Sequence, residues 1–443
     1  MKKILIVPSN TDLNRGDQSL TWASITIAKE VFADDIDIYL YKSKGKLAEN
    51  TKTNYQTEKL GYPFLIRILS HPRRDDTNNE VNFSKFTLIK WGFRAIKDLL
   101  VTLMLLSRVK LINKIGVFFL NKDQKKTYNA FTELDGLFVK GGGFLHSYGS
   151  IIDPYIMYFQ LFDIFLAKKY KLPVFILPNS IGPLRNRFAK KIVLKALKYA
   201  NVVYVRESTS LDYLESEGVN ALKSPDLGFY LKPSKRDFKN YLHGKGIPVG
   251  YKKCIALTLR PYRFDGKQNA NKLYENYLTQ IKNFILDSLS KGMNVTLIAH
   301  TIGPSAHEND SIPLKEIFSS IKPHEDLIYL NDRNLNSEEM EKIYSYYDLV
   351  VGTRFHSVIF ALNVNTPALA IAYGGNKATG IMNDMNLSKF VVPIENPESS
   401  KLIELTNIIL NDTEGYISKI ENYKVKLQKE KEKLVGKIQK YYN

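Results

Sequence analysis

Residues 348–362 read DLVVGTRFHSVIFAL, and their pattern decides the fold. Residues 348–351 form a short, mostly apolar run of the kind that makes a buried strand. A polar junction follows at 353–357, and the apolar residues after it continue as a helix. A strand that passes directly into a helix is half of a βαβ unit, so this stretch predicts a parallel sheet covered by helices.

The same alternation of short apolar runs and helix-length amphipathic stretches recurs along nearly the whole chain. Strands are expected in the first half at residues 3–8, 36–41, 136–140, 174–178 and 202–205. Further strands are expected in the second half at 254–259, 294–299, 327–330, 348–351 and 368–371. The chain has 443 residues, more than one hydrophobic core normally serves. We therefore predict an α/β protein with two sheets, one in each of two domains.

A polar stretch punctuated by glycine and proline, residues 231–250, separates the two groups of strands. This places the boundary near residue 245, with an N-terminal domain at 1–245 and a C-terminal domain at 246–415. The N-terminal domain carries an insertion at about 43–130. Residues 416–443 place apolar side chains on one stripe of a helix whose other faces are rich in lysine, which predicts a terminal amphipathic helix. Its stripe either docks back onto the N-terminal domain or contacts a partner or membrane.

The composition favours an anionic partner. With 63 Lys and Arg against 45 Asp and Glu, the formal net charge is +18. Nucleic-acid binding would need a clustered basic face with stacking aromatics, whereas the basic residues are spread along the chain and concentrated mainly in the C-terminal helix. Cys254 is the only cysteine, which excludes an intrachain disulfide and predicts a small buried side chain in a strand. No signal peptide is expected at the N-terminus.

The most apolar stretch, residues 99–106, is too closely flanked by Lys97, Asp98, Arg108 and Lys110 to span a membrane. Two interpretations stay open. The stretch and its neighbours form either a buried helix pair within the insertion or a basic amphipathic segment lying on a membrane surface.

Ligands of open α/β sheets bind at the carboxyl ends of the strands, so the residues that follow each strand are the first candidates. After the first strand come Asn14, Gly16 and Asp17, where Asp17 serves either as a helix cap or as a base or hydroxyl-binding group. Residues 141–146, GGGFLH, follow a later strand and allow close approach of the backbone. Arg206 follows another strand, and from its position alone an exposed strand-end charge is the simpler interpretation.

The sharpest junction contains Arg354 and His356, at the start of a helix whose N-terminus already favours an anion. A guanidinium fork and an imidazole there predict a phosphate or carboxylate site. Lys377, after the next strand, and Arg260, at the end of residues 254–259, add positive charge. The C-terminal domain is therefore the expected anion-binding half.

Several other kinds of site find no support. The seven histidines are scattered, and His307-Glu308-Asn309-Asp310 lacks the second histidine of a zinc-binding helix. The glycine run at 141–143 has neither P-loop nor dinucleotide spacing. No Gly-x-Ser-x-Gly elbow suggests a serine nucleophile. We expect neither a metal nor a cofactor.

The ordered set of motifs resembles the polysaccharide pyruvyl transferase family, from about residue 4 to about 390. The matching motifs are Asn14-x-Gly16-Asp17, Gly141-Gly142-Gly143, Ser180-Ile181-Gly182-Pro183, Val205-Arg206-Glu207-x-x-Ser210, Pro225-Asp226, Arg354-Phe355-His356, and Tyr373 with Lys377. The family often has Arg-Leu-His and Arg-Asp where this chain has Phe355 and Glu207.

The resemblance implies two Rossmann-like domains facing across a cleft, as in GT-B glycosyltransferases. It also implies transfer of a pyruvyl group from the co-substrate phosphoenolpyruvate to two hydroxyls of a sugar as a ketal. We expect His356 and Asp17 to be catalytic, as proton donor and base. The implied donor site comprises Arg354, Phe355, His356, Arg206, Arg260 and Lys377. The implied acceptor site comprises Asn14, Gly16, Asp17, Gly142, Gly143 and His146.

Two alternatives remain at this point: a GT-B glycosyltransferase using a nucleotide sugar, and a non-catalytic anion-binding protein. The expected partners are phosphoenolpyruvate and a glycan acceptor that is either free or lipid-linked. The positive charge also predicts peripheral contact with an anionic membrane. We accordingly expect a cytoplasmic protein at the inner face of the membrane.

Overall fold

The computed structural model describes residues 1–9, 11–42, 52–69, 85–264, 267–374 and 377–442. The chain divides into two compact units. Unit one comprises Met1–Asp12, Leu20–Leu227 and Glu430–Asn443, and unit two comprises Leu13–Ser19 and Gly228–Lys429. Each unit is built around one parallel sheet, which confirms the α/β class predicted from the strand–helix alternation.

Unit one contains an eight-stranded sheet in the order β3-β2-β1-β4-β6-β7-β8, with β5 paired to β6. Its strands are β1 (Lys2–Val7), β2 (Ile36–Lys42), β3 (Phe64–Ile66), β4 (Gly136–Val139), β5 (Gly142–Ser147), β6 (Val174–Leu184), β7 (Val202–Val205) and β8 (Leu222–Lys223). Its helices are most of α1 (Arg15–Phe32), then α3 (Tyr55–Glu58), α4 (Lys85–Leu106), α5 (Lys110–Phe118), α6 (Lys122–Ala130), α7 (Asp153–Lys169), α8 (Arg187–Leu197) and α9 (Ser208–Ser216). Every strand pair is parallel.

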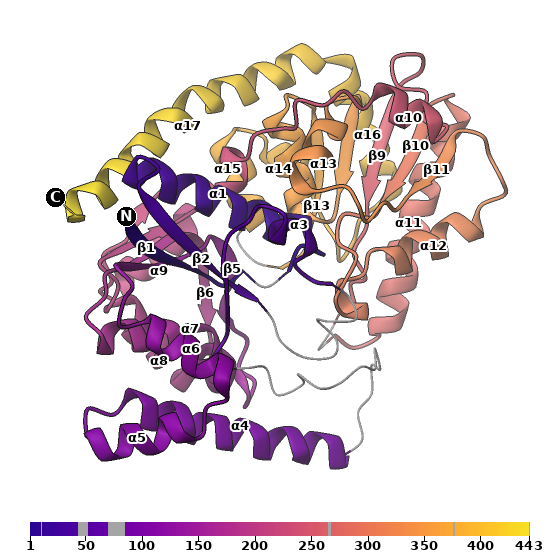
Figure 1. The fold of residues 1–443 in the computed structure, drawn as a ribbon. Coiled ribbons are helices and arrows are strands. Elements are labelled where there is room, and N and C mark those ends of the chain that lie inside the picture. Colours follow the sequence, from indigo (N-terminus) through magenta and orange to yellow (C-terminus); the bar gives the residue numbers. More distant parts are fainter. Residues whose placement is uncertain (10, 43–51, 70–84, 265–266, 375–376, 443) are drawn as a thin grey trace. The chain divides into compact units, whose positions relative to one another are not determined.

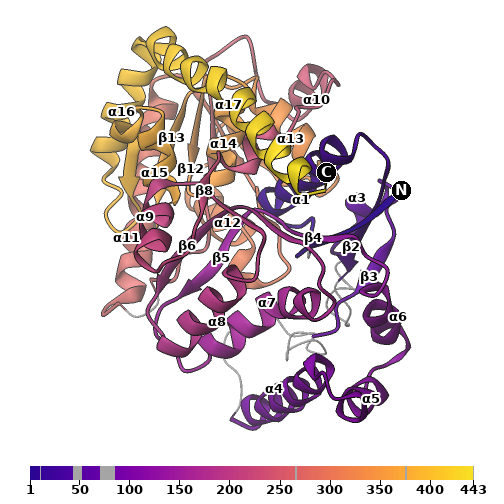
Figure 2. The same ribbon diagram turned by 90° about the vertical axis from the view of Figure 1, so that its left-hand side faces the viewer.

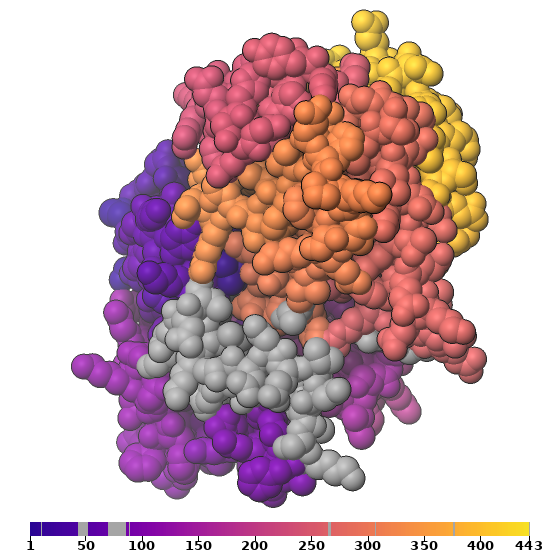
Figure 3. Space-filling view, turned by 90° about the vertical axis from the view of Figure 1, so that its right-hand side faces the viewer, coloured from indigo at the N-terminus to yellow at the C-terminus, as the bar shows by residue number. Residues whose placement is uncertain are grey.

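Unit two contains a six-stranded parallel sheet in the order β11-β10-β9-β12-β13-β14. Its strands are β9 (Cys254–Thr258), β10 (Asn294–Ile298), β11 (Leu327–Leu330), β12 (Leu349–Gly352), β13 (Ala368–Ala372) and β14 (Val391–Pro393). Its helices are α10 (Lys239–Gly244), α11 (Ala270–Ser290), α12 (Ser311–Ser320), α13 (Ser337–Tyr344), α14 (Phe355–Asn363), α15 (Lys377–Asp384), α16 (Ser399–Asn411) and the first half of α17 (Thr413–Tyr442). Figure 3 shows the side of this unit on which α10, α11 and α12 are exposed.

All ten predicted strands are present, because each is a mostly apolar run of four or more residues that is at least partly buried. Four strands were not predicted. β3, β8 and β14 have two or three residues, too few for a periodic signal. The fourth is β5, which begins at Gly142 in the glycine run and pairs with an extension of β6, because β6 runs on to Leu184 instead of ending at residue 178 as predicted.

The units meet in sequence at Leu227 and Gly228, earlier than the expected boundary near residue 245. The polar stretch after Gly228 is part of unit two and not a linker, because Phe238, Leu242 and Ile247 within it are fully buried. The other difference is Leu13–Ser19, which belongs to unit two although it lies near the N-terminus.

Helix α17 covers the stretch predicted as a terminal amphipathic helix and is seen along its length in Figure 2. In its unit-two half, the hydroxyl of Tyr416 donates to the carbonyl of Ala368 at 2.5 Å. In its unit-one half, Leu434 and Ile438 are fully buried, and Tyr442 stacks edge-on against Phe32. The apolar stripe is therefore used within the protein, apart from Tyr441, which is half exposed.

The predicted insertion, residues 43–130, includes residues 43–51 and 70–84, which lie outside the described part. Its described residues are more than a surface excursion, since β3 extends the sheet beside β2. Helix α6 is tied to β3 where the hydroxyl of Thr127 donates to the carbonyl of Ile66 at 2.7 Å. Helices α4 and α5 lie beyond α6, α7 and α8, as the outermost layer of unit one in Figures 1 and 2. Among the described residues, no helix has the length and apolarity needed to cross a membrane.

Candidate functional site

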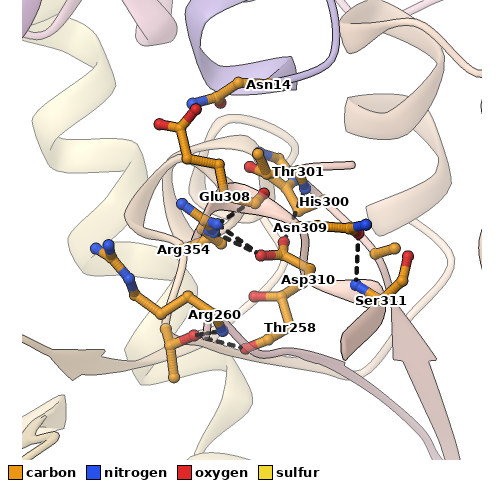
Figure 4. Close-up of polar contacts among 12 residues, drawn as sticks. Asn14, Thr258, Arg260, His300, Thr301, Glu308, Asn309, Asp310, Ser311 and Arg354 are labelled. Atoms are coloured by element: carbon orange, nitrogen blue, oxygen red, sulfur yellow. Dashed lines mark hydrogen bonds and ion pairs between the residues drawn. The ribbon is translucent and has the colours of Figure 1, made fainter. Parts of the chain in front are cut away.

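The strand order of unit two reverses direction between β9 and β12, the point at which open α/β sheets bind ligands. Arg260 follows β9 and Arg354 follows β12. The two strand ends are joined through Thr353, whose hydroxyl accepts from the backbone N–H of Arg260 at 2.7 Å and donates to the carbonyl of Thr258 at 3.2 Å (Figure 4). The backbone that carries both arginine side chains is therefore held in place at the switch point.

Arg354 is buried and held by a carboxylate. Its Nε donates to Asp310 at 2.8 Å, and its Nη2 donates to the carbonyl of Glu308 at 3.1 Å. The other oxygen of Asp310 accepts from the backbone N–H of Thr301 at 2.7 Å, and burial raises the pKa of this carboxyl. Figure 4 shows Arg354 and Asp310 pointing toward each other. This pairing fixes the guanidinium where α14 begins.

His356 lies in the first turn of α14, next to the first residue of α15. The ammonium of Lys377 is 3.1 Å from Nε2 of His356. An ammonium only donates hydrogen bonds, so Nε2 accepts in this contact. Phe355 is buried, with Lys377 5.6 Å above its ring. Residues 375 and 376, which directly precede Lys377, lie outside the described residues.

Arg260 is held by aromatic rings instead of a carboxylate. Its guanidinium lies 3.9 Å from the ring centre of Tyr373 and 5.5 Å from that of Tyr262. Its Nε is buried and has no hydrogen-bond partner among the described residues. A buried guanidinium nitrogen without an acceptor is costly, so this is a position that an anionic ligand would satisfy.

The N-terminal motif lies in this same site. Asn14 forms an antiparallel bridge with Thr301, and its side-chain oxygen accepts from the backbone N–H groups of Gly16 and Asp17 at 3.0 and 3.3 Å. Gly16 packs directly on His356: an added Cβ would lie 2.5 Å from Cγ of that imidazole and closer still to Nδ1. The requirement for glycine here is therefore steric and is set by the histidine.

Arg15 anchors this motif and was not predicted. The fully buried guanidinium donates to four backbone carbonyls: those of Leu335 at 3.1 Å, Ala299 at 2.9 Å, His300 at 3.1 Å and Asp332 at 2.6 Å. Ser337 adds a hydrogen bond to the carbonyl of Arg15 at 2.8 Å. Position 15 is the unspecified residue of the motif, so no sequence signal marked it.

Glu308 and His300 also belong to the site and were missed. Burial, and then the charge of Asp17, raise the pKa of Glu308, whose side chain points toward Asn14 in Figure 4. Burial, and then Arg15 and His356, lower the pKa of His300 well below its ordinary value. In the sequence, Glu308 stands out only as part of an incomplete zinc motif. The signal that could have identified Glu308 is its place after β10, at the same sheet edge as Arg260 and Arg354.

Arg206 is in unit one and is buried, so the interpretation as an exposed strand-end charge was wrong. It forms a 2.7 Å ion pair with Asp226 and donates to the hydroxyl of Ser180 at 2.7 Å. An added Cβ on Gly143 would lie 2.8 Å from its Nη2. Near this glycine, Nδ1 of His146 is 3.0 Å from the carbonyl of Gly143, and burial lowers the pKa of His146.

The structure thus divides the predicted site residues between the two units. Unit two brings together Asn14, Gly16, Asp17, Arg260, Arg354, Phe355, His356 and Lys377. Unit one holds Gly142, Gly143, His146 and Arg206. The expected acceptor set has members in both units: Asn14, Gly16 and Asp17 belong to unit two, and Gly142, Gly143 and His146 belong to unit one.

Comparison with known proteins identifies the family. The family model described as polysaccharide pyruvyl transferase matches residues 14–375. The chain is 24% identical to the amylovoran biosynthesis protein AmsJ of Erwinia amylovora over 299 residues, 66% of this chain and 68% of that protein.

Two solved structures show the fold. A UDP-GlcNAc 2-epimerase from Methanocaldococcus jannaschii superposes with a TM-score of 0.53 at 14% identity, covering 93% of each chain. A sucrose-phosphate synthase from Thermosynechococcus elongatus gives 0.53 at 10% identity, covering 100% of this chain and 98% of the other. The fold is GT-B-like, with two Rossmann-like domains in one chain. Since the family model spans most of the chain, this protein belongs to the polysaccharide pyruvyl transferase family and is a transferase acting in glycan biosynthesis.

Proposed function

We propose that the donor is phosphoenolpyruvate, and that its pyruvyl group is joined to two hydroxyls of a sugar as a cyclic ketal with release of phosphate. The observation that carries this proposal is the cluster of Arg260, Arg354, His356 and Lys377 at the switch point of unit two. Phosphoenolpyruvate carries a phosphate and a carboxylate, and guanidinium groups bind both kinds of anion in a bidentate manner.

Each cation has a part in this binding mode. Arg354 is held by Asp310, so it offers the donors not used in that pair. Arg260 offers its buried Nε, which lacks an acceptor. Lys377 is a flexible point charge beside the N-terminus of α14, where the helix dipole favours an anion. No cofactor is needed, because the enol phosphate supplies the reactive carbon.

The reaction balances without an oxidant or reductant. A proton adds to the methylene carbon, and a sugar hydroxyl attacks the oxocarbenium-like C2. The bond from C2 to the phosphate oxygen then breaks, and the second hydroxyl closes the ketal. Of the two protons lost by the sugar, one replaces the proton given to the methyl group and the other leaves with phosphate.

His356 is the group to which we assign protonation of the methylene carbon, since imidazole titrates near neutral pH. Its Nε2 accepts from Lys377 in the structure. The Lys377 ammonium must therefore turn toward the donor phosphate before Nε2 can carry a proton. Asp17, whose charge reaches Glu308, is the base that we assign to the acceptor hydroxyl.

Thermal unfolding in the presence of ligands tests the donor. Phosphoenolpyruvate should raise the Tm of the protein, because a ligand that binds only the folded state stabilises it. The shift should be lost in Arg260→Ala and Arg354→Ala and kept in Arg236→Ala, a matched variant at an exposed arginine of unit two. A shift with UDP, a UDP-sugar or CMP and none with phosphoenolpyruvate would instead establish glycosyl transfer.

The role of His356 is tested separately. His356→Ala should abolish turnover while the Tm shift with phosphoenolpyruvate persists. If turnover survives in His356→Ala and is lost in Arg354→Ala, the proton donor is another group.

A further inference from the structure

The outer face of α4 carries a continuous apolar stripe. Its members recur at intervals of three and four residues, which places them on one side of the helix: Phe86, Ile89, Phe93, Ile96, Leu100 and Leu103. Phe86 is 77% exposed and Phe93 is 71% exposed. Large apolar side chains occur singly on most surfaces, but a contiguous stripe of six indicates an interaction site.

Helix α5 extends this surface. It lies beside α4 in both ribbon views, and Gly116 packs against Met104 so closely that an added Cβ would lie 2.9 Å from the methionine Cβ. The exposed apolar residues that α5 and its end contribute are Leu111, Ile112, Ile115, Phe118 and Phe119. We call the two helices, residues 85–119, the helical hairpin.

The opposite side of the hairpin is fixed to unit one. The hydroxyl of Tyr158 donates to that of Thr102 at 3.0 Å, and Lys169 donates to the carbonyl of Leu105 at 2.6 Å. Leu105 is fully buried. These contacts hold the inner face of the hairpin against α7. The apolar stripe, on the outer face, therefore does not pack on that part of unit one.

Basic side chains border the stripe. Lys90 and Lys97 each follow a stripe residue by one position and are exposed, and Lys110 and Lys114 are exposed along α5. Residues 85–119 contain one acidic residue, Asp98, against the following basic residues: Lys85, Lys90, Arg94, Lys97, Arg108, Lys110 and Lys114. An apolar face rimmed by lysine is the pattern of helices that lie in the interface of an anionic bilayer.

We propose that the outer face of the helical hairpin docks on the surface of a bilayer containing anionic lipids. The apolar stripe enters the boundary between headgroups and acyl chains, and the lysines contact lipid phosphates. The charge favours this occupant over a second copy of the chain, because two hairpins face to face would bring together like charges. The hairpin lies on the surface, since no described helix meets the requirements for a membrane span.

Vesicle sedimentation tests the proposal. The full-length protein should pellet with vesicles of phosphatidylglycerol and phosphatidylcholine, and at least about tenfold less with phosphatidylcholine alone, since anionic headgroups supply the attraction. High salt should weaken the binding. Equal binding to both kinds of vesicle, or to neither, overturns the proposal.

Two variants locate the surface. Phe86→Ser with Phe93→Ser and Phe118→Ser, or Lys90→Gln with Lys97→Gln and Lys114→Gln, should each lower the bound fraction about tenfold or more. All six side chains are exposed, and Arg94 and the other neighbours stay unchanged. Folding should therefore be preserved, as judged by Tm.

The matched controls carry the same changes elsewhere. Ile151→Ser with Phe188→Ser and Tyr251→Ser removes three exposed apolar side chains. Lys191→Gln with Lys195→Gln and Lys198→Gln removes three exposed charges from and beside α8. Both control variants should bind as the unmodified protein does. A control that loses binding equally shows that general charge or apolarity, and not the hairpin, is responsible.

The single cysteine allows a direct readout. Cys254 is buried, and burial raises its pKa to about 12, so an introduced surface thiol can be labelled selectively. An environment-sensitive dye on Phe118→Cys should shift to the blue with anionic vesicles, whereas the same dye on Phe188→Cys should not. If the Phe118→Cys dye shifts with protein concentration in the absence of vesicles, the hairpin is an interface between copies and the proposal is wrong.

Discussion

At the scale of single residues, the site depends on side chains whose positions are fixed by groups far away in sequence. Arg354 is aimed by Asp310, and His356 rests on Gly16. The sequence identified Arg354, His356 and Gly16, because each follows a strand or opens a helix. It did not identify Arg15 or Glu308, because four carbonyl acceptors and a neighbouring aspartate become visible only when the chain is folded.

Gly16→Ala should disturb the site through His356. The added methyl group has no room beside the imidazole, so we expect a loss of about 1–3 kcal/mol of stability from overpacking and a large fall in turnover. In a His356→Ala background the stability cost should disappear, because the clashing ring is gone. Thermal unfolding of the unmodified protein, the two single variants and the double variant measures this coupling. An equal cost in both backgrounds would assign the effect to the backbone of α1 instead.

Glu308 should give the protein a specific dependence on pH. Its pKa in the folded state lies above the ordinary 4.5, because of burial and the charge of Asp17. Its contribution to stability is therefore fully present below pH 4.5 and is lost as pH rises through the folded-state pKa.

Glu308→Gln removes this titration. The free energy of unfolding of the variant, relative to the unmodified protein, should increase as pH rises above 4.5. Urea unfolding across a series of pH values measures the difference. A difference that stays constant with pH would show that Glu308 titrates normally.

At the scale of elements, prediction succeeded where a strand was long and apolar and failed where pairing depended on context. β9, β10 and β12 are such strands. Their order in the sheet places the switch point of unit two between β9 and β12. β5 begins with glycines, and its strand conformation comes only from the extension of β6 beside it. No local pattern contains that information, since the partner is more than thirty residues away.

The first turn of α1 is held in unit two by Arg15, and this element should be sensitive to a conservative change. Arg15→Lys replaces a planar fork that contacts four carbonyls with a shorter point charge. We expect a loss of about 2 kcal/mol, the scale of hydrogen bonds to a charged group, and reduced turnover through displacement of Asp17. The urea midpoint measures the loss. Arg236→Lys, at an exposed site, should change it by less than about 0.5 kcal/mol.

At the scale of the whole molecule, neither unit is contiguous in sequence. Residues 430–443 complete unit one, where Leu434 and Ile438 are fully buried and Lys431 pairs with Glu30. The sequence predicted the amphipathic helix from its spacing. It did not predict that the helix is shared between units, because one apolar stripe looks the same whichever core it enters.

Deleting residues 430–443 should therefore destabilise unit one by several kcal/mol, since each fully buried leucine or isoleucine is worth about 2–5 kcal/mol against alanine. Differential scanning calorimetry should show a lower first transition. Leu434→Ala with Ile438→Ala in the full chain should reproduce much of the effect. An unchanged thermogram after deletion would show that these side chains contribute little to the core.

The shared segments also constrain how the protein is made. The Leu13–Ser19 segment leaves the ribosome early, yet the strand ends and carbonyls that hold it, around residues 299–337, are synthesised far later. Unit one likewise needs residues 430–443, which are synthesised after the rest of the unit. Domains usually fold one after another as they emerge. Here unit two needs residues up to Lys429 and unit one needs residues 430–443, so a nascent chain stalled before residue 429 carries neither unit complete.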